Sequence, residues 1–180
     1  FGVAFCSEAV SAGQQFFPQR LEIVDLAVKD DPHGLVFIGD GREKPRLVER
    51  AKREGLSNCL FVPPVKKVAL AELTGRIDCG LMILADVPAF YFGTSPNKFF
   101  DYLASGLPVV AADAMALPHL VHDGENGYLF TPGSENDLAE KLERVLRLPQ
   151  DQLDAMKNES LSIVAAHDIN RTLTTFEHLY

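Results

Sequence analysis

The sequence has few cysteines, no long apolar run and no cluster of basic residues. Its three cysteines, Cys6, Cys59 and Cys79, lie far apart, each in or beside a predicted strand, which fits small buried side chains better than disulfides or metal ligands. No apolar run approaches the ~20 residues of a membrane-spanning helix. A formal net charge of −8, without any stretch rich in Lys and Arg, disfavours nucleic acid as a partner. The composition is that of a soluble globular domain.

The histidines show little sign of a metal site. Among the five, only His119 and His122 have a spacing that recurs in metal sites, three residues apart on a predicted helical turn. A solvated or capping role is more common for such a pair, so we expect neither a metal nor another cofactor. The chain also lacks an initiating Met and a signal-peptide pattern, and we therefore expect it to be a piece of a longer protein.

Strands and helices alternate along the chain, which is one domain, residues 1–180, by length. The expected strands are 2–6, 35–38, 58–62, 79–84, 109–112 and 127–130, and the expected helices are 18–29, 43–54, 70–77, 95–105, 134–146 and one or two beyond 150, with a single turn at 117–122. This alternation predicts an α/β fold, a Rossmann-like parallel sheet with helices on both faces. Ligands of such sheets bind outside the carboxyl ends of the strands.

One stretch, residues 93–110, carries most of the functional information. Ser95 suits a helix N-cap and Pro96 the first helical position, and Gly106 followed by Pro108 ends the helix. The apolar side chains of this helix recur at helical spacing and are expected to face the core: Phe99, Phe100, Tyr102 and Leu103. The stretch therefore predicts a capped amphipathic helix with one polar face.

That polar face predicts an anion site at the start of the helix. Unpaired amides around Thr94 and Ser95, together with the positive end of the helix dipole, favour an anion, most commonly phosphate. Asp101 lies about 9 Å further along the axis at ~1.5 Å per residue. That offset suits a pyrophosphate at the amides and a ribose hydroxyl pair on the carboxylate. Lys98 either neutralises phosphate charge or pairs with Asp101 three residues on.

These residues resemble the nucleotide-sugar motif in the C-terminal half of family-4 retaining glycosyltransferases, which have the two-Rossmann-domain (GT-B) fold. The resemblance is strongest to a branch, often found in cell-surface polysaccharide synthesis, that reads Ser-Pro-x-Lys-x-x-Glu-Tyr-Met-Ala-x-Gly-x-Pro-Val-Val. It extends from about residue 35 to about residue 148. The resemblance implies that Asp101 binds the ribose in place of the usual Glu, and that Gly93 replaces a Glu that contacts the transferred sugar.

Two further loops match the same family. Gly39 and Gly41 flank an aspartate after a predicted strand, which by itself indicates either a close backbone approach to a ligand or only a tight turn. The resemblance adds weight, because family members often show Gly-Asp-Gly here. A later proline-containing loop, matched by Pro64 and Val65, meets the nucleobase in the family. The neighbouring Lys66 and Lys67 are interpreted as a solvated loop pair.

The first loop departs from the family pattern. The family usually places an Arg and, about five residues on, a Lys-Gly pair there to clamp the diphosphate. Residues 7–17 contain neither Lys nor Arg, and the nearest cation is Arg20. The segment 123–130, with the Pro-Gly pair that follows it, also resembles the family and is interpreted as a structural turn.

We expect this chain to be the donor-binding half of a GT-B glycosyltransferase. It would transfer a sugar from a nucleotide diphosphate, with UDP favoured, to an acceptor with retention and without a metal. The N-terminal acceptor domain would be absent, so the isolated domain would be inactive, and no catalytic residue is assigned. We expect a cytoplasmic protein, with peripheral membrane association of the full-length protein at the inner face. The alternatives are a UDP-sugar epimerase of the same two-domain type and a non-catalytic partner or nucleotide-sensing module.

The C-terminal segment carries more apolar side chains than a tail requires: Leu161, Ile163, Val164, Leu173, Phe176 and Tyr180. In proteins of the resembled family the last helix crosses back onto the N-terminal half, which would leave some of these side chains exposed here. Packing on the domain's own sheet is equally compatible with the pattern.

Overall fold

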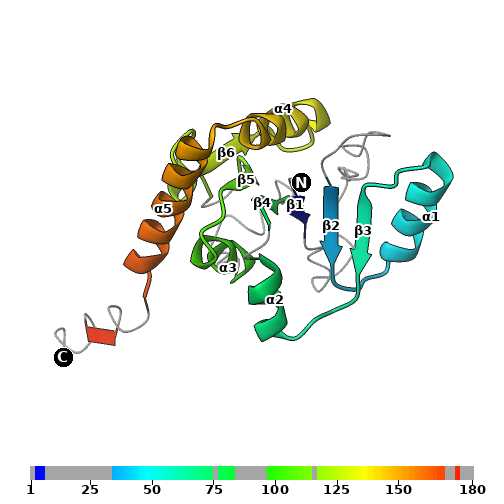
Figure 1. Cartoon of the computed structure of the whole chain (residues 1–180), viewed down its shortest axis with the longest axis horizontal. Coiled ribbons are helices and arrows are strands. Elements are labelled where there is room, and N and C mark those ends of the chain that lie inside the picture. Colours follow the sequence, from blue (N-terminus) through cyan, green and yellow to red (C-terminus); the bar gives the residue numbers. More distant parts are fainter. Residues whose placement is uncertain are drawn as a thin grey trace.

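The computed structural model of the protein describes residues 3–6, 34–74, 77–83, 97–114, 117–168 and 173–174. Its strands form one parallel sheet, in the order β3-β2-β1-β4-β5-β6 (Figure 1). The strands are β1 (Val3–Cys6), β2 (Gly34–Ile38), β3 (Cys59–Val62), β4 (Cys79–Met82), β5 (Val109–Ala112) and β6 (Gly127–Phe130). The expected strands at 109–112 and 127–130 are confirmed to the residue. The expected helix at 18–29 lies outside the described residues.

The described helices and one short 3-10 turn lie between the strands or follow the last of them. They are α1 (Lys44–Glu54), α2 (Lys67–Thr74), α3 (Asn97–Ala104), the 3-10 turn η3 (Leu117–His119), α4 (Glu135–Leu146) and α5 (Gln150–Ala166). The prediction for α2 was wrong at both ends, because the helix begins at Lys67 rather than at residue 70 and ends at Thr74. Lys67 and Val68 in its first turn are exposed, and the side of α2 that packs on the core begins only at Leu70, where the helix was predicted to start.

Helices cover both faces of the sheet, as the alternating pattern predicted (Figure 1). On one face, Phe37, Leu81 and Phe130 pack with buried residues of α1 and α4. On the other face, Met82 and Val109 pack with residues of α2, α3 and α5. Successive side chains of a strand point to opposite faces, so a continuous apolar run fills both layers. The fold is Rossmann-like α/β, and no helix in the described ranges is long and apolar enough to cross a membrane.

Helix α3 lies tightly against the sheet. The side chains of Phe99, Tyr102 and Leu103 are at most 1% exposed, which confirms the predicted core face, and Phe100 is partly buried beside them. Beneath the helix, a Cβ on Gly80 of β4 would lie only 2.7 Å from Cδ2 of Tyr102. The glycine therefore lets the tyrosine ring rest directly on the strand, and this fixes which face of α3 is left toward solvent.

Helix α5 packs on α3. Some apolar residues of the C-terminal segment pack on this domain and others are exposed, so each of the two expected arrangements holds for part of the segment. Ser160 is fully buried and its hydroxyl donates to the carbonyl oxygen of Leu107 at 2.8 Å. Ile163 and Val164 pack against the core of this domain. Leu161 is 44% exposed, and Leu173 beyond the helix is 52% exposed. Phe176 and Tyr180 lie outside the described residues.

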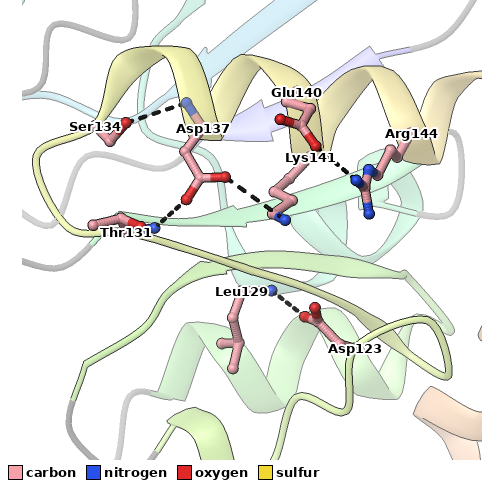
Figure 2. Close-up of polar contacts among 8 residues, drawn as sticks. All are labelled: Asp123, Leu129, Thr131, Ser134, Asp137, Glu140, Lys141 and Arg144. Carbon is pink, nitrogen blue, oxygen red and sulfur yellow. Dashed lines mark hydrogen bonds and ion pairs between the residues drawn. The ribbon is translucent and has the colours of Figure 1, made fainter.

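The turn between β5 and β6 is held by its own polar groups, which supports the structural interpretation of segment 123–130. The amide of Asn126 is buried, accepts from the His122 N–H at 2.7 Å and donates to the Leu120 carbonyl at 2.9 Å. Asp123 accepts from the backbone N–H of Leu129 at 2.7 Å (Figure 2). Gly127 is required because a Cβ there would lie 1.9 Å from the Val109 carbonyl oxygen.

The start of α4 completes this corner of the molecule (Figure 2). Ser134 is the N-cap, and its hydroxyl accepts from the Asp137 backbone N–H at 3.2 Å. The Asp137 carboxylate accepts from the backbone N–H of Thr131 at 2.7 Å and lies 3.7 Å from Lys141 Nζ. These contacts, with the Thr131 hydrogen bond the largest cause, lower the pKa of Asp137. Asp137 is therefore a structural acid that closes the turn before the helix.

Candidate functional site

The carboxyl ends of the strands bring the predicted loops to one edge of the sheet. Ile38 at the end of β2 pairs with Val62 at the end of β3, and Met82 of β4 pairs with Ala111 of β5. The strand order reverses between β1 and β4, which is the topological switch point where open parallel sheets bind ligands. The Gly39 loop and the proline loop after Val62 both leave the sheet at this edge.

The two glycines of the Gly-Asp-Gly turn have different roles. Gly39 has a φ of +135°, which side-chain-bearing residues rarely adopt, and a Cβ there would meet no atom within 4 Å. Its backbone therefore borders open space at the carboxyl edge. Gly41 is not among the described glycines with positive φ, and its carbonyl oxygen accepts from the Lys44 N–H at 3.2 Å as α1 begins. The tight-turn interpretation thus fits Gly41, and the close approach of a ligand to Gly39 stays a prediction.

A lysine that the sequence did not single out joins the two loops. Nζ of Lys44 donates to the carbonyl oxygen of Gly39 at 2.6 Å and to that of Val62 at 3.0 Å. The Gly39 N–H also donates to the Val62 oxygen at 3.1 Å. A small pocket lies at this junction, lined by Phe37, Ile38, Gly39, Lys44, Leu47 and Phe61. No spacing rule relates Lys44 to Val62, so only the folded sheet reveals this contact.

The proline loop leads from β3 directly to α2. Val65 is half-buried and packs against the core, which anchors the loop. Pro64 is exposed and therefore accessible from solvent. Lys66 and Lys67 are both exposed, as predicted, but the prediction that Lys67 lies in a loop was wrong. Lys67 is the first residue of α2, and its Nζ lies 3.5 Å from Oδ1 of Asp101 on α3.

The polar face of α3 is turned toward this loop. The side chain of Asp101 is 37% exposed and that of Lys67 is 83% exposed. An ion pair this exposed is worth at most about 1 kcal/mol, so the carboxylate stays accessible to a ligand. Lys98 is half-buried on the same helix.

Ser105 closes the end of α3 and links it to α2 through one hydroxyl contact. The Asp101 carbonyl oxygen accepts from the backbone N–H of Ser105 at 3.1 Å and from its hydroxyl at 2.9 Å. That hydroxyl also lies 2.9 Å from the hydroxyl oxygen of Thr74 at the end of α2. The other predicted site residues on this stretch, Gly93, Thr94 and Ser95, lie outside the described residues, so the anion site stays a prediction.

Cysteine and metal chemistry find no support in the described ranges. Burial raises the pKa of the Cys79 thiol to about 12, so this cysteine stays protonated and unreactive. No group of three or more His, Cys, Asp or Glu side chains within those ranges could hold a metal ion. His122 instead lies 3.5 Å from Glu125 in the β5–β6 turn.

The strand order and the loops at the carboxyl edge define a Rossmann-like domain, and its sheet matches one half of a GT-B glycosyltransferase. The family described as glycosyl transferases group 1 matches residues 3–148. This chain belongs to the glycosyl transferases group 1 family.

Three similar proteins illustrate the relationship. The chain is 33% identical over 115 residues to the UDP-glycosyltransferase TURAN of Arabidopsis thaliana, covering 60% of this chain and 23% of TURAN. Anabaena Alr3699/HepE, solved in complex with UDP, superposes with a TM-score of 0.72 at 22% identity, over 96% of this chain and 48% of HepE. The solved C-terminal domain of the group 1 glycosyltransferase LpcC of Francisella tularensis has a TM-score of 0.71 at 20% identity, over 94% of this chain and 87% of that chain. The match thus spans about a quarter of TURAN and about half of HepE.

Proposed function

We propose that this chain is the donor-binding domain of a glycosyltransferase that transfers a sugar from a UDP-sugar to an acceptor, with retention of anomeric configuration and without a metal. Two contacts beside the proline loop carry the proposal, one from Gly39 to Val62 just before the loop and one from Lys67 just after it to Asp101, in a chain of the glycosyl transferases group 1 family. The UDP in the HepE complex and the UDP-glycosyltransferase TURAN support UDP as the nucleotide.

Each site residue has a proposed role. The backbone amides of Gly93, Thr94 and Ser95 bind the diphosphate at the start of α3, and Lys98 neutralises part of its charge. Asp101 accepts hydrogen bonds from the ribose hydroxyls. The base lies against the backbone of Gly39 and Gly41 and against the loop of Pro64 and Val65.

A second domain is proposed to complete the active site. Group transfer needs donor and acceptor held together in a cleft that excludes water. The agreement with the C-terminal domain of LpcC supports the assignment of residues 1–180 to the donor half, with acceptor binding by an N-terminal domain. The full-length protein is proposed to be cytoplasmic, with peripheral association at the inner face of the membrane, and to act in polysaccharide synthesis. The isolated donor domain should bind nucleotide without transferring sugar.

The proposed function is tested by nucleotide binding to the 180-residue chain. Titrations with UDP, GDP and ADP should show the tightest binding for UDP, and backbone amide NMR shifts should concentrate at Gly39, at Val65 beside the prolines and at the non-proline residues of 93–101. Shifts confined to α4 and α5 would contradict the proposed site. A UDP-sugar epimerase would instead convert the free nucleotide sugar without an acceptor, and a sensing module would bind it without turnover by the full-length protein.

A further inference from the structure

Lys44 places a positive charge at the start of a helix, which is an electrostatically unfavourable position, and two backbone carbonyl oxygens at the sheet edge accept hydrogen bonds from it. It is the first residue of α1, after the N-cap Glu43. The positive end of a helix dipole disfavours a cation there. Within the first turn of α1 no residue is acidic, and the carboxylate of the N-cap Glu43 is engaged by Arg46 at 2.8 Å. The ammonium group is instead satisfied by the carbonyl oxygens of Gly39 and Val62.

These two carbonyl oxygens belong to the two loops that face the proposed base site. Gly39 directly follows the last residue of β2, and Val62 is the last residue of β3, directly before the proline loop. Hydrogen bonds from an ammonium group are stronger than neutral ones, and both contacts of Lys44 are partly buried, where water competes less. The Gly39 N–H closes a third link to the Val62 oxygen. The β2–β3 pairing brings the starts of the two loops together, and the Lys44 side chain adds two links that hold them there.

We propose that Lys44 is a positioning residue for nucleotide binding, which fixes the Gly39 loop against the start of the proline loop so that the base enters a preformed slot. The inference rests on the proposed function, because it assigns these loops to the nucleotide. Ordering the loops before binding removes part of the entropy cost that the ligand would otherwise have to offset. Lys44 thus acts through the backbone of Gly39 and Val62.

The test compares Lys44→Met and Lys44→Arg with the wild-type chain. Methionine keeps the apolar stem that lines the pocket and removes the ammonium group. Lys44→Met should weaken UDP binding about tenfold, or ~1.4 kcal/mol, at a temperature where the variant is fully folded. Lys44→Arg retains donors and should recover part of the affinity. Lys52→Met, which changes an exposed lysine of the same helix, is the matched control and should bind UDP like the wild type.

A second readout needs no ligand. Amide hydrogen exchange at Gly39 should speed up in Lys44→Met and not in Lys52→Met, because the N–H of Gly39 bonds within the same junction. Unchanged UDP affinity in folded Lys44→Met would overturn the positioning role and leave the proposed function intact. Unchanged exchange at Gly39 would also overturn it. Failure of the wild-type chain to bind any of the three nucleotides would overturn the proposed function and this role together.

Discussion

Two aspartates of this domain, Asp137 and Asp101, sit in opposite kinds of surroundings. Asp137 accepts from the Thr131 backbone N–H at 2.7 Å, lies beside Lys141 and has a lowered pKa (Figure 2). Asp101 lies 3.5 Å from the highly exposed side chain of Lys67. The first carboxylate is committed to backbone groups of its own turn, and the second is accessible at the carboxyl edge of the sheet. An acid that does little for the fold is the better candidate for a ligand.

The contrast extends to the regions around the two acids. The corner between β5 and α4 is closed by buried or backbone-directed polar contacts, such as those of Asn126 and Ser134. The edge near Asp101 leaves Pro64 exposed and Gly39 beside open space. Changes in the corner should therefore reduce stability, and changes at the edge should reduce ligand binding.

The largest effect is expected in the corner, from Gly127→Ala. A Cβ at this position would overlap the Val109 carbonyl oxygen at 1.9 Å, and a backbone atom cannot move aside as a flexible side chain can. We expect a loss of about 3 kcal/mol or more in the free energy of unfolding, measured by urea denaturation. Gly34→Ala is the control, because its Cβ would meet the Asn58 oxygen at an ordinary 3.6 Å. Equal stability of the two variants would contradict the close contact between β5 and β6.

Asp137→Ala should cost about 1–2 kcal/mol of unfolding free energy, because it removes the acceptor for the Thr131 N–H at the start of α4. Glu140→Ala, which removes only an exposed pair with Arg144 on the same helix, should change stability by less than about 0.5 kcal/mol. Neither change should alter UDP affinity. A drop in UDP affinity in folded Asp137→Ala would contradict the prediction that this corner contributes to stability and not to ligand binding.

The contribution of Asp137 should also depend on pH. Its pKa is lowered in the folded protein from an ordinary value of 3.8, so its stabilisation is complete above that value and disappears as the pH falls through the lower folded-state pKa. The difference in unfolding free energy between the wild type and Asp137→Ala should therefore be constant near neutrality and shrink below about pH 4. A difference that grows on acidification would mean that the protonated form is favoured by folding.

The elements of this fold were predictable where the signal lies within a few residues. Continuous apolar runs bounded by turn residues predicted β5 and β6 exactly, and helical spacing predicted the buried face of α3. The first turn of α2 was missed because the residues that pack on the core begin only after it. For Asp101, the sequence predicted its place on the polar face of a helix and nothing about its partner. Its partner Lys67 comes from another helix, and nothing in the local sequence relates the two.

The same limit applies to Lys44. Its acceptor oxygens belong to backbone groups, one of them 18 residues away. Every residue has a backbone carbonyl oxygen, so the amino-acid types do not show which one accepts a hydrogen bond from Lys44. From the sequence alone, this lysine is only one of several charged residues at the start of a helix. The junction between the Gly39 loop and the proline loop is therefore a property of the parallel pairing of β2 with β3.

At the open edge, Asp101→Asn should leave stability nearly unchanged and weaken UDP binding by about tenfold. The amide keeps the shape of the side chain but loses the charge that strengthens hydrogen bonds to the ribose, each worth roughly 1.5–3 kcal/mol, and ~1.4 kcal/mol is a factor of ten in affinity. Isothermal titration calorimetry measures the affinity. Unchanged UDP binding would make Asp101 a surface acid paired with Lys67 and nothing more.

The smallest effect is expected from Lys67→Met, and it isolates the ion pair itself. The pair is exposed and worth roughly 0.2–1 kcal/mol, so its loss should hardly change stability. Uridine carries no phosphate, and Lys67 can affect its binding mainly by competing for the Asp101 carboxylate. Lys67→Met should therefore tighten uridine binding slightly, by no more than about fivefold, which corresponds to ~1 kcal/mol.

In the Asp101→Asn background the same change should have no effect on uridine binding, because the competition for the carboxylate is already removed. Weaker uridine binding in Lys67→Met alone would mean that the lysine holds the carboxylate in its binding orientation instead of competing for it.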